Sequence, residues 1–272
     1  MPNEAGGVNY SNEIQQWGKE IVLALNEVVG PVVDTKTTIG LFLPELHILG
    51  ASEVAEAWLH IGSQSVYEKD VVVAENFGAM TTHRSAKAMK YAGCGYTIIG
   101  HIEERRAINE LFALASVQNP VLTNGVLQKR IATAQAAGLK VVYCIGESES
   151  EQDNWQEVLN RQLEIGLQGV DTTSIVIAYE PIWAIGPGKT PPEKDYIEKI
   201  ATFIKEKTNG LPVIYGGGLK KANAQMIASC ANVDGGLIAL TQFEGNIGFY
   251  PSDVRDIITL YRTGVSEDET TI

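Results

Sequence analysis

Residues 175–193, IVIAYEPIWAIGPGKTPPE, join a short apolar run to a loop rich in proline and glycine. Such a nearly continuous apolar run is typical of a strand covered on both faces in a parallel sheet. One carboxylate, Glu180, follows the run. Taken alone, Glu180 fits an ordinary buried acidic residue before a turn, and the alternative is a general base with a hinged lid behind it. The rest of the chain bears on this choice.

Similar apolar runs alternate with segments of helical periodicity along most of the chain. The expected strands are 38–44, 71–76, 96–101, 141–147, 175–181, 211–217 and 235–241. The expected helices are 12–29, 85–93, 124–138, 156–168, 193–207 and 250–262. Gly93 and Gly138 stand where helices are expected to end. Strands alternating with helices predict an α/β fold with a parallel sheet.

Polar residues and glycines stand at the carboxyl ends of several expected strands. They are Asn76, His101, Glu147, Glu180 and residues 216–218. Catalytic groups from many strand ends meet at one face of a closed (β/α)8 TIM barrel, which this pattern favours. An open doubly wound sheet is the alternative, but no phosphate-binding glycine fingerprint opens an early strand–helix turn. We expect one barrel domain over residues 1–263 and an acidic tail over 264–272.

The first strand of such a barrel is hard to find. It should precede the helix that begins near Asn12, where the sequence is short and polar. Either GGVNY, residues 6–10, is a degenerate edge strand, or the strand lies upstream of the first residue given.

Composition limits the function classes. The net charge of −12 argues against a general nucleic-acid binder, and an anionic substrate would need locally arranged positive charge. We expect no membrane span and no signal peptide, because no apolar run is long enough and the N-terminus lacks a basic region before an apolar one. The three cysteines are far apart, without zinc-site spacing, which favours a reduced cytoplasmic protein.

Three motifs together resemble the triosephosphate isomerase family. They are AYEPIWAIGPGK (178–189), GHIEERR (100–106) and CIGE (144–147), with a weaker match at YGGG (215–218). The resemblance follows the family's motif order over about residues 70–260. It implies an isomerase of glycolysis and gluconeogenesis that interconverts a small phosphorylated aldose and ketose. The implied partner is a phosphorylated sugar, and proton transfer of this kind needs no cofactor or metal.

The resemblance also implies roles for individual residues. Glu180 would remove a proton from the carbon next to the substrate carbonyl, and His101 would donate a hydrogen bond to that carbonyl. In triosephosphate isomerase itself, a glutamate base, a neutral histidine and a closing loop act in this way. Gly186, in the lid, would offer its backbone N–H to the phosphate. Lys189 is either part of the far hinge or an ordinary solvated lysine.

A supporting carboxylate is implied after His101. The motif has Ile102 where the family has serine and carries one more residue, so either Glu103 or Glu104 could point inward, and Glu104 is the candidate. A salt-bridged helix start is the alternative. Cys144 and Glu147 are expected to be structural.

The binding end departs from the family. The family's first strand ends in Asn-Trp-Lys, whereas Asn9 is followed here by Tyr and Ser, and no lysine occurs before Lys19. Ala239 and Leu240 replace paired glycines in the phosphate loop, and Gly218 replaces a serine while keeping the backbone N–H. A truncated start would explain the missing lysine. The candidates for substrate or phosphate binding are therefore Asn9, Gly186, Gly218, Ala239 and Leu240.

Because of these departures, a second functional hypothesis stands beside the first, and the oligomeric state is left open. The alternative is a catalytically impaired relative kept as a binding or regulatory protein. The loop after Asn76 is counted as shorter than the family's dimer loop, so a homodimer is possible but not assumed. Residues 108–125 are expanded relative to the family.

Overall fold

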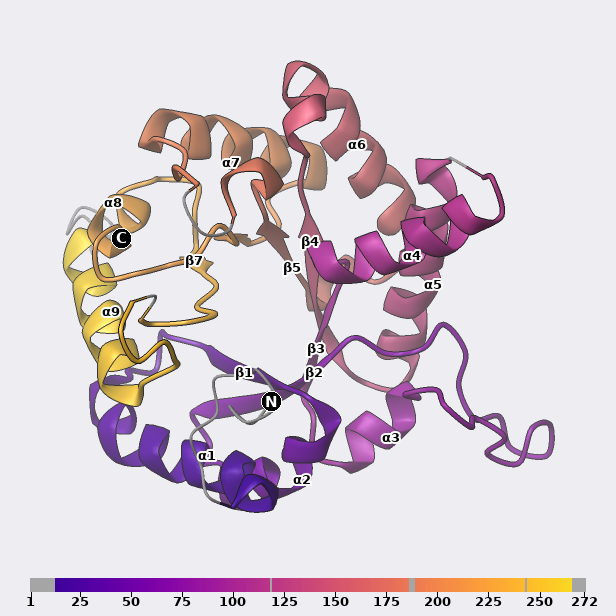
Figure 1. Cartoon of the computed structure of the whole chain (residues 1–272), viewed down its shortest axis with the longest axis horizontal. Helices are drawn as coiled ribbons and strands as arrows, with labels where there is room; N and C mark the ends of the chain where they lie inside the picture. The colour runs from indigo at the N-terminus through magenta and orange to yellow at the C-terminus, as the bar shows by residue number, and fades with distance from the viewer. Residues whose placement is uncertain (1–12, 118, 186–188, 243, 266–272) are drawn as a thin grey trace.

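The computed structural model describes residues 13–117, 119–185, 189–242 and 244–265. Their seven strands are β1 Ile39–Leu43, β2 Leu59–Gln64, β3 Tyr96–Ile99, β4 Lys140–Ile145, β5 Ile175–Tyr179, β6 Val213–Tyr215 and β7 Gly235–Gly236. Every neighbouring pair is parallel, and the strands follow one another in chain order. The sheet curls into part of a barrel with β1 and β7 at its edges and the helices outside it (Figure 1).

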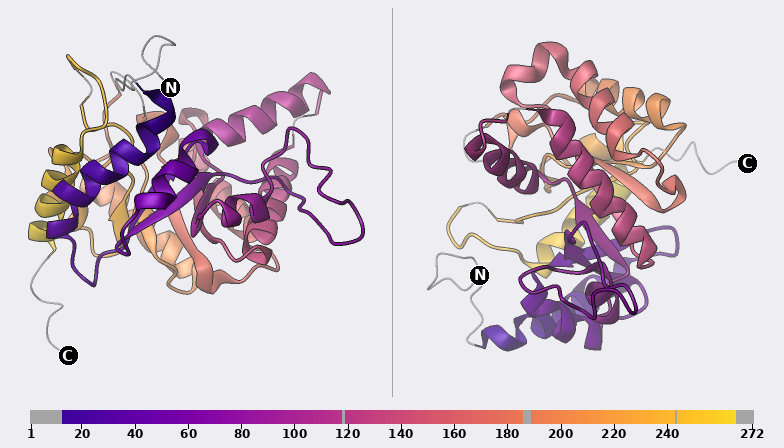
Figure 2. Two further views of the ribbon diagram at one scale, coloured as in Figure 1. Left: turned by 90° about the horizontal axis from the view of Figure 1, so that it is seen from below. Right: turned by 90° about the vertical axis from the view of Figure 1, so that its right-hand side faces the viewer.

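The α-helices of the described residues cover the outer face of this curled sheet (Figure 2). They are α1 Trp17–Val28, α2 Glu45–Val54, α3 Ala86–Tyr91, α4 Ile102–Leu114, α5 Pro120–Ala136, α6 Trp155–Gly166, α7 Lys194–Thr208, α8 Ala224–Ala228 and α9 Pro251–Gly264. The last helix, α9, contacts α1. Arg262 of α9 also donates to the Val32 carbonyl at 2.7 Å and pairs with Asp34 at 2.9 Å. These contacts join the two ends of the helical layer. No helix of the described part is long and apolar enough to span a membrane.

The α/β barrel class expected from the sequence is confirmed, with one strand misplaced. Residues 71–76 form no strand. They lie in the connection from β2 to α3, where Val73 is 88% exposed. The strand at this place in the sheet is β2, with the sequence LHIGSQ. It was not predicted, because a glycine and polar residues interrupt its apolar pattern. Gly62 is required there, since a Cβ would lie 2.5 Å from the Phe42 ring, and Ser63 is satisfied by the Thr97 hydroxyl at 2.9 Å.

This correction changes the loop count. The connection begins at Ser65, not after Asn76, and it extends away from the barrel (Figure 1). The prediction of a short loop, which was counted from Asn76, is therefore wrong. Asn76 is not at a strand end either, since its side chain bonds within the loop, to the Asp70 carbonyl at 2.9 Å and the Val72 N–H at 3.1 Å. The expected first-strand region, Asn9 included, and the tail from residue 266 lie outside the described residues.

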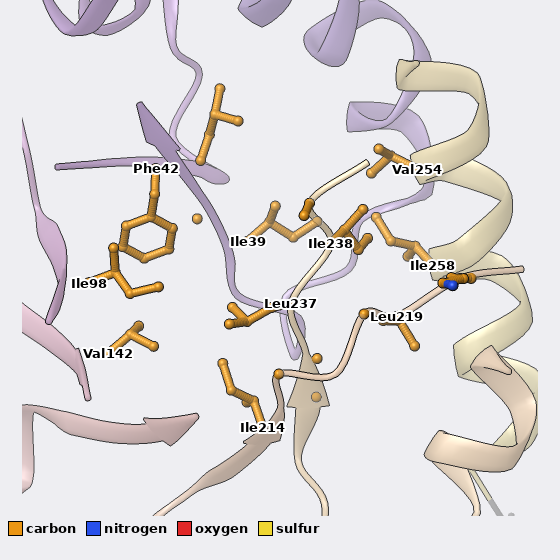
Figure 3. Close-up of a pocket in the computed structure, with 18 of the residues that line it drawn as sticks. Ile39, Phe42, Ile98, Val142, Ile214, Leu219, Leu237, Ile238, Val254 and Ile258 are labelled. Atoms are coloured by element: carbon orange, nitrogen blue, oxygen red, sulfur yellow. The ribbon is translucent and has the colours of Figure 1, made fainter. Parts of the chain in front are cut away.

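Successive side chains of a strand point alternately to two hydrophobic cores, one between the sheet and the helices and one inside the barrel. In β4, Tyr143 and Ile145 pack outward with the helices, whereas Val142 and Cys144 face the barrel interior. The inward set from several strands and the residues that line the space toward α9 appear together in Figure 3. In β5, Ala178 faces inward, so the same period of two points residue 180 inward as well.

Candidate active site

Glu180 stands at the carboxyl end of β5 and is only 2% exposed. Its backbone N–H donates to the Ile145 carbonyl at 2.8 Å, which continues the pairing of β4 with β5. Two glycines make room for it. A Cβ on Gly146 would lie 1.9 Å from the Glu180 carbonyl oxygen, and one on Gly216 would lie 2.7 Å from its Cγ. The neighbouring strand ends are thus shaped around this one glutamate.

His101 lies beside Glu180, as the sequence predicted for the two candidates. The distance from His101 Nε2 to Glu180 Oε1 is 3.3 Å. His101 is also the N-cap of α4, where its Nδ1 accepts the Glu103 N–H at 3.4 Å. A ring nitrogen that accepts a backbone N–H carries no proton, so the neutral tautomer has its proton on Nε2. The nitrogen that faces Glu180 is therefore a donor.

Burial controls the proton affinity of both side chains. It raises the pKa of Glu180 to about 8, against the opposing effect of the Ile102 N–H, which donates to Oε2 at 3.1 Å. Burial also lowers the pKa of His101, against the opposing effect of the charges on Glu103 and Glu104. Desolvation disfavours a charged group, so it makes the carboxylate more basic and keeps the imidazole neutral. A carboxyl group with a raised pKa and a neutral hydrogen-bond donor therefore lie side by side in the lining of one cavity.

Glu104 is the inward glutamate of the pair left open by the sequence. Its side chain is 12% exposed, against 85% for Glu103. Glu104 accepts the Gly100 N–H and pairs with Arg130, both at 2.5 Å, and it also accepts the Ser65 hydroxyl. Glu104 therefore connects the residues that follow β2 and β3 to α5, close to His101.

Arg105 is a site-building residue that the sequence analysis did not single out. The guanidinium is buried and donates to the carbonyls of Gly100 and Cys144, each at 2.8 Å. It also reaches the Asn124 side chain at 2.8 Å and the Tyr143 hydroxyl at 3.1 Å. A guanidinium with several fixed donors can hold two strand ends and α5 at once. The only feature of the sequence that could have pointed to Arg105 is its position within the GHIEERR motif.

Glu147, expected to be structural, anchors the start of the lid. One oxygen of this buried carboxylate accepts from three donors. They are Trp183 Nε1 at 2.8 Å, the Tyr179 hydroxyl at 2.9 Å and the Tyr196 hydroxyl at 3.1 Å. The Glu147 carbonyl also accepts the Ile182 N–H at 3.2 Å. Burial raises the pKa of Glu147, and the three donors oppose that rise.

The segment expected to be a lid is described only at its two ends. The 3-10 turn Ile182–Ala184 follows Pro181, and the Trp183 ring packs edge-on against Tyr196. Gly186, the expected phosphate donor, lies outside the described residues. On the far side, Lys189 is half exposed and its amine lies 3.5 Å from the Glu149 carboxylate. Among the described residues, the firmly held end of the lid is therefore the one bound to Glu147.

The glycine loop after β6 borders the base directly. Gly216 contacts Glu180, as stated above, and Gly218 has a φ of +90°. An L-residue is strained at that angle, which accounts for glycine where the family has serine. Ala239 and Leu240 follow β7 and line the same cavity as Glu180 and His101. The structure thus gathers all the described site candidates at one end of the barrel, whereas Asn9 lies outside the described residues.

The described residues contain no cluster of His, Cys, Asp and Glu that could hold a metal ion. The buried Cys144 contacts Glu180 from the barrel interior, and burial holds the pKa of its thiol well above the usual range. The thiol is therefore a neutral neighbour of the base.

Fold and site define an α/β barrel with an acid–base pair at the carboxyl ends of its strands. The triosephosphate isomerase family model matches residues 10–246. The chain belongs to the triosephosphate isomerase family. This confirms the family and the isomerase class expected from the sequence.

Individual relatives agree with this assignment. A triosephosphate isomerase of Pseudoalteromonas translucida is 31% identical over 231 residues, which cover 80% of this chain and 84% of that protein. One from Synechococcus sp. is 34% identical over 190 residues, 68% of each chain. The crystal structure of triosephosphate isomerase from Bartonella henselae superposes with a TM-score of 0.68 at 23% identity, covering 94% of this chain and 96% of that one. The last comparison supports the barrel fold.

Proposed function

We propose that this chain interconverts a small phosphorylated aldose and ketose, a triose phosphate or a close relative, through an enediolate. The observation that carries the proposal is the buried Glu180 carboxylate 3.3 Å from the donor nitrogen of His101. Family membership supports the reaction class, and the pair supplies the two groups that the reaction needs.

In this proposal Glu180 takes a proton from the carbon next to the substrate carbonyl. Burial favours that step because it raises the pKa of Glu180 to about 8, close to the pH at which the base must work. The electron pair left behind moves onto the carbonyl oxygen, where the His101 Nε2–H donates a hydrogen bond. A proton must then move from the hydroxyl oxygen of the enediolate to the former carbonyl oxygen, while Glu180 returns its proton to the former carbonyl carbon. The former hydroxyl carbon becomes the new carbonyl, which completes the isomerisation and regenerates the base.

The lid would keep water away from the enediolate. The Glu147 hydrogen bonds to Trp183, Tyr179 and Tyr196 fix where the moving segment begins. A closed lid would also bring the Gly186 backbone N–H, proposed from the resemblance, to the phosphate. We assign Gly218 and the loop at Ala239 and Leu240 to the same phosphate.

The test is turnover of a panel of phosphorylated aldose–ketose pairs by the wild type and two variants. Glu180→Gln keeps the shape but removes the base, and we expect it to lower kcat by about 10²–10⁴-fold. Glu103→Gln removes the same charge from an exposed residue in the first turn of α4 and should retain activity. Equal rates for Glu180→Gln and the wild type, or no turnover with any pair, would contradict the proposal.

The Ala239–Leu240 loop favours the alternative of an impaired binding or regulatory relative. The Leu240 side chain lines the cavity where the family has a glycine, and it limits the approach of a phosphate to the backbone. Thermal unfolding with 2-phosphoglycolate, a phosphorylated mimic of the enediolate, separates the two functions. Strong stabilisation supports the isomerase. Little change in the midpoint, together with absent turnover, would support the impaired relative.

A further inference from the structure

We propose that Asp253, in the first turn of α9, is a positioning residue that fastens the loop between β7 and α9, and that this fastened loop limits the length of the sugar that the cavity accepts. The inference rests on the proposed function, since it concerns which phosphorylated sugars the same cavity takes. We call residues 237–242 and 244–250, which join β7 to α9, the β7–α9 loop. The loop lies at the carboxyl end of the barrel and projects from it beside α9 (Figure 2).

The β7–α9 loop folds back on itself through an antiparallel pairing. The Gln242 N–H donates to the Gly248 carbonyl at 3.1 Å, and the Gly248 N–H donates to the Gln242 carbonyl at 3.2 Å. The Thr241 hydroxyl accepts the Tyr250 N–H at 2.9 Å. The Tyr250 hydroxyl in turn donates to the Asn246 carbonyl at 2.9 Å. Because both halves of the loop are bonded to each other, a contact that holds one half also holds the other.

Asp253 joins this loop to the preceding one. Its side chain is buried, and its Oδ2 accepts from Gln242 Nε2 at 3.0 Å. Its Oδ1 pairs with the Lys221 amine at 2.6 Å. Lys221 belongs to the segment after β6, in which Gly216 borders Glu180. One carboxylate, bonded through both oxygens, therefore connects the loop beside the base to the β7–α9 loop.

The Asp253 carboxylate is suited to this role because its charge is stabilised where it stands. The hydrogen bond from Lys221 lowers the pKa of Asp253, burial opposes this effect, and the bonds from Gln242 and Thr241 lower it further. The first turn of a helix also favours a negative charge. Moving either loop away would leave a buried charge without one of its partners, which is costly.

The fastened loop forms part of the wall of the cavity. Leu240, Glu244 and Gly248 line the same cavity as the acid–base pair. A wall that is bonded within itself and to Asp253 resists moving back to make room for a longer molecule. Such a wall discriminates by size, because each added carbon of a sugar must clash with it or displace it.

The chain provides a matched control and a second variant. Asp256, one turn further along α9, also pairs with the Lys221 amine, at 2.8 Å. Its other partner is Arg255, so both of its partners lie outside the β7–α9 loop. Asp256→Asn thus removes a carboxylate from the same lysine and leaves the bond to Gln242 in place. Gln242→Ala does the converse, since it breaks the bond to the loop and keeps the pair of Asp253 with Lys221.

The experiment compares Asp253→Asn, Gln242→Ala and Asp256→Asn with the wild type by binding, kinetics and amide exchange. The binding probes are 2-phosphoglycolate and the longer 4-phosphoerythronate. For Asp253→Asn and Gln242→Ala, we expect the affinity for the longer acid, relative to the shorter one, to rise about tenfold, as for the loss of one hydrogen bond. With dihydroxyacetone phosphate, KM should rise while kcat stays within about twofold, because the base and the donor are untouched.

Amide hydrogen exchange reports on the loop without any substrate. The amides of Gln242 and Gly248 should exchange faster in Asp253→Asn and Gln242→Ala, and as in the wild type in Asp256→Asn. Equal exchange in all four proteins would show that Asp253 does not fasten the loop. The exposed position of Gln242 should leave the unfolding midpoint of Gln242→Ala unchanged, which separates a loosened loop from a loss of fold.

The outcomes also separate this inference from the proposed function. A wild type that turns over a triose phosphate, with the same ratio of affinities in all four proteins, would overturn the limit on sugar length alone. A wild type that turns over no pair and binds neither acid would overturn the proposed function and, with it, the limit on sugar length. The exchange measurement would then still decide whether Asp253 fastens the loop.

Discussion

Replacing Glu180 with glutamine should change how the stability of the protein depends on pH. The folded-state pKa of about 8 lies above the value of 4.5 for an exposed glutamate, so the folded protein holds the proton more tightly than the unfolded chain. The contribution of Glu180 to stability is therefore fully present below pH 4.5 and is lost as the pH rises through about 8. Glutamine, which does not titrate, lacks this loss.

The size of the effect follows from the two pKa values. Each pH unit between them removes about 1.4 kcal/mol from the free energy of unfolding. Between pH 5 and pH 8, the wild type should thus lose about 3–4 kcal/mol relative to Glu180→Gln, slightly less than the full slope because Glu180 is half ionised at pH 8. For a chain of this size, that difference corresponds to about 6–16 °C in the unfolding midpoint.

The assay is denaturant or thermal unfolding of both proteins at a series of pH values, with Glu103→Gln as the control. Glu103 is 85% exposed, so its replacement should give a curve parallel to that of the wild type. Titrations common to all three proteins cancel in the differences. A difference between wild type and Glu180→Gln that does not vary with pH would refute the assignment of a buried carboxyl with a raised pKa.

Three other outcomes are expected. Glu147→Ala should destabilise the protein by about 3–5 kcal/mol in denaturant unfolding, because one buried and two half-buried donors lose their acceptor, and Glu147→Gln should cost less; equal midpoints for the two would contradict this. Gly216→Ala should reduce turnover at least tenfold by pushing the Glu180 side chain aside, whereas Gly125→Ala, in open space on α5, should keep full activity and gain up to about 1 kcal/mol. The three buried cysteines, whose thiol pKa values burial raises, should react with a thiol reagent at pH 8 only after unfolding, and rapid labelling of the native protein would show that they are exposed.

Sequence patterns predicted the parts of the fold that depend on local periodicity. The apolar run before Glu180 predicted the strand and placed the glutamate at its end. This was possible because the apolar pattern and the end of the strand depend only on residues that are neighbours in sequence. β2 was missed because its glycine and serine are explained only by contacts with Phe42 and Thr97 on other strands. The apolar residues 71–73 lie in an exposed loop, which composition alone does not distinguish from a strand.

Site candidates could be named from the sequence where residue type carries the chemistry, and not where the backbone or distant residues do. The motifs named Glu180 and His101 as candidates, and the structure places them 3.3 Å apart. The N–H that donates to Glu180 is the backbone group of Ile102, so the type of side chain at this position could not predict the hydrogen bond.

The most direct test of Glu180 as a base is proton–deuterium exchange followed by NMR. Dihydroxyacetone phosphate and a small panel of phosphorylated ketoses would be incubated in D2O with the wild type and with Glu180→Gln. We predict exchange at the carbon beside the carbonyl with the wild type, even where net turnover is slow, and none above background with the variant. Exchange at equal rates in the two proteins, or no exchange with any of these ketoses, would contradict the assignment.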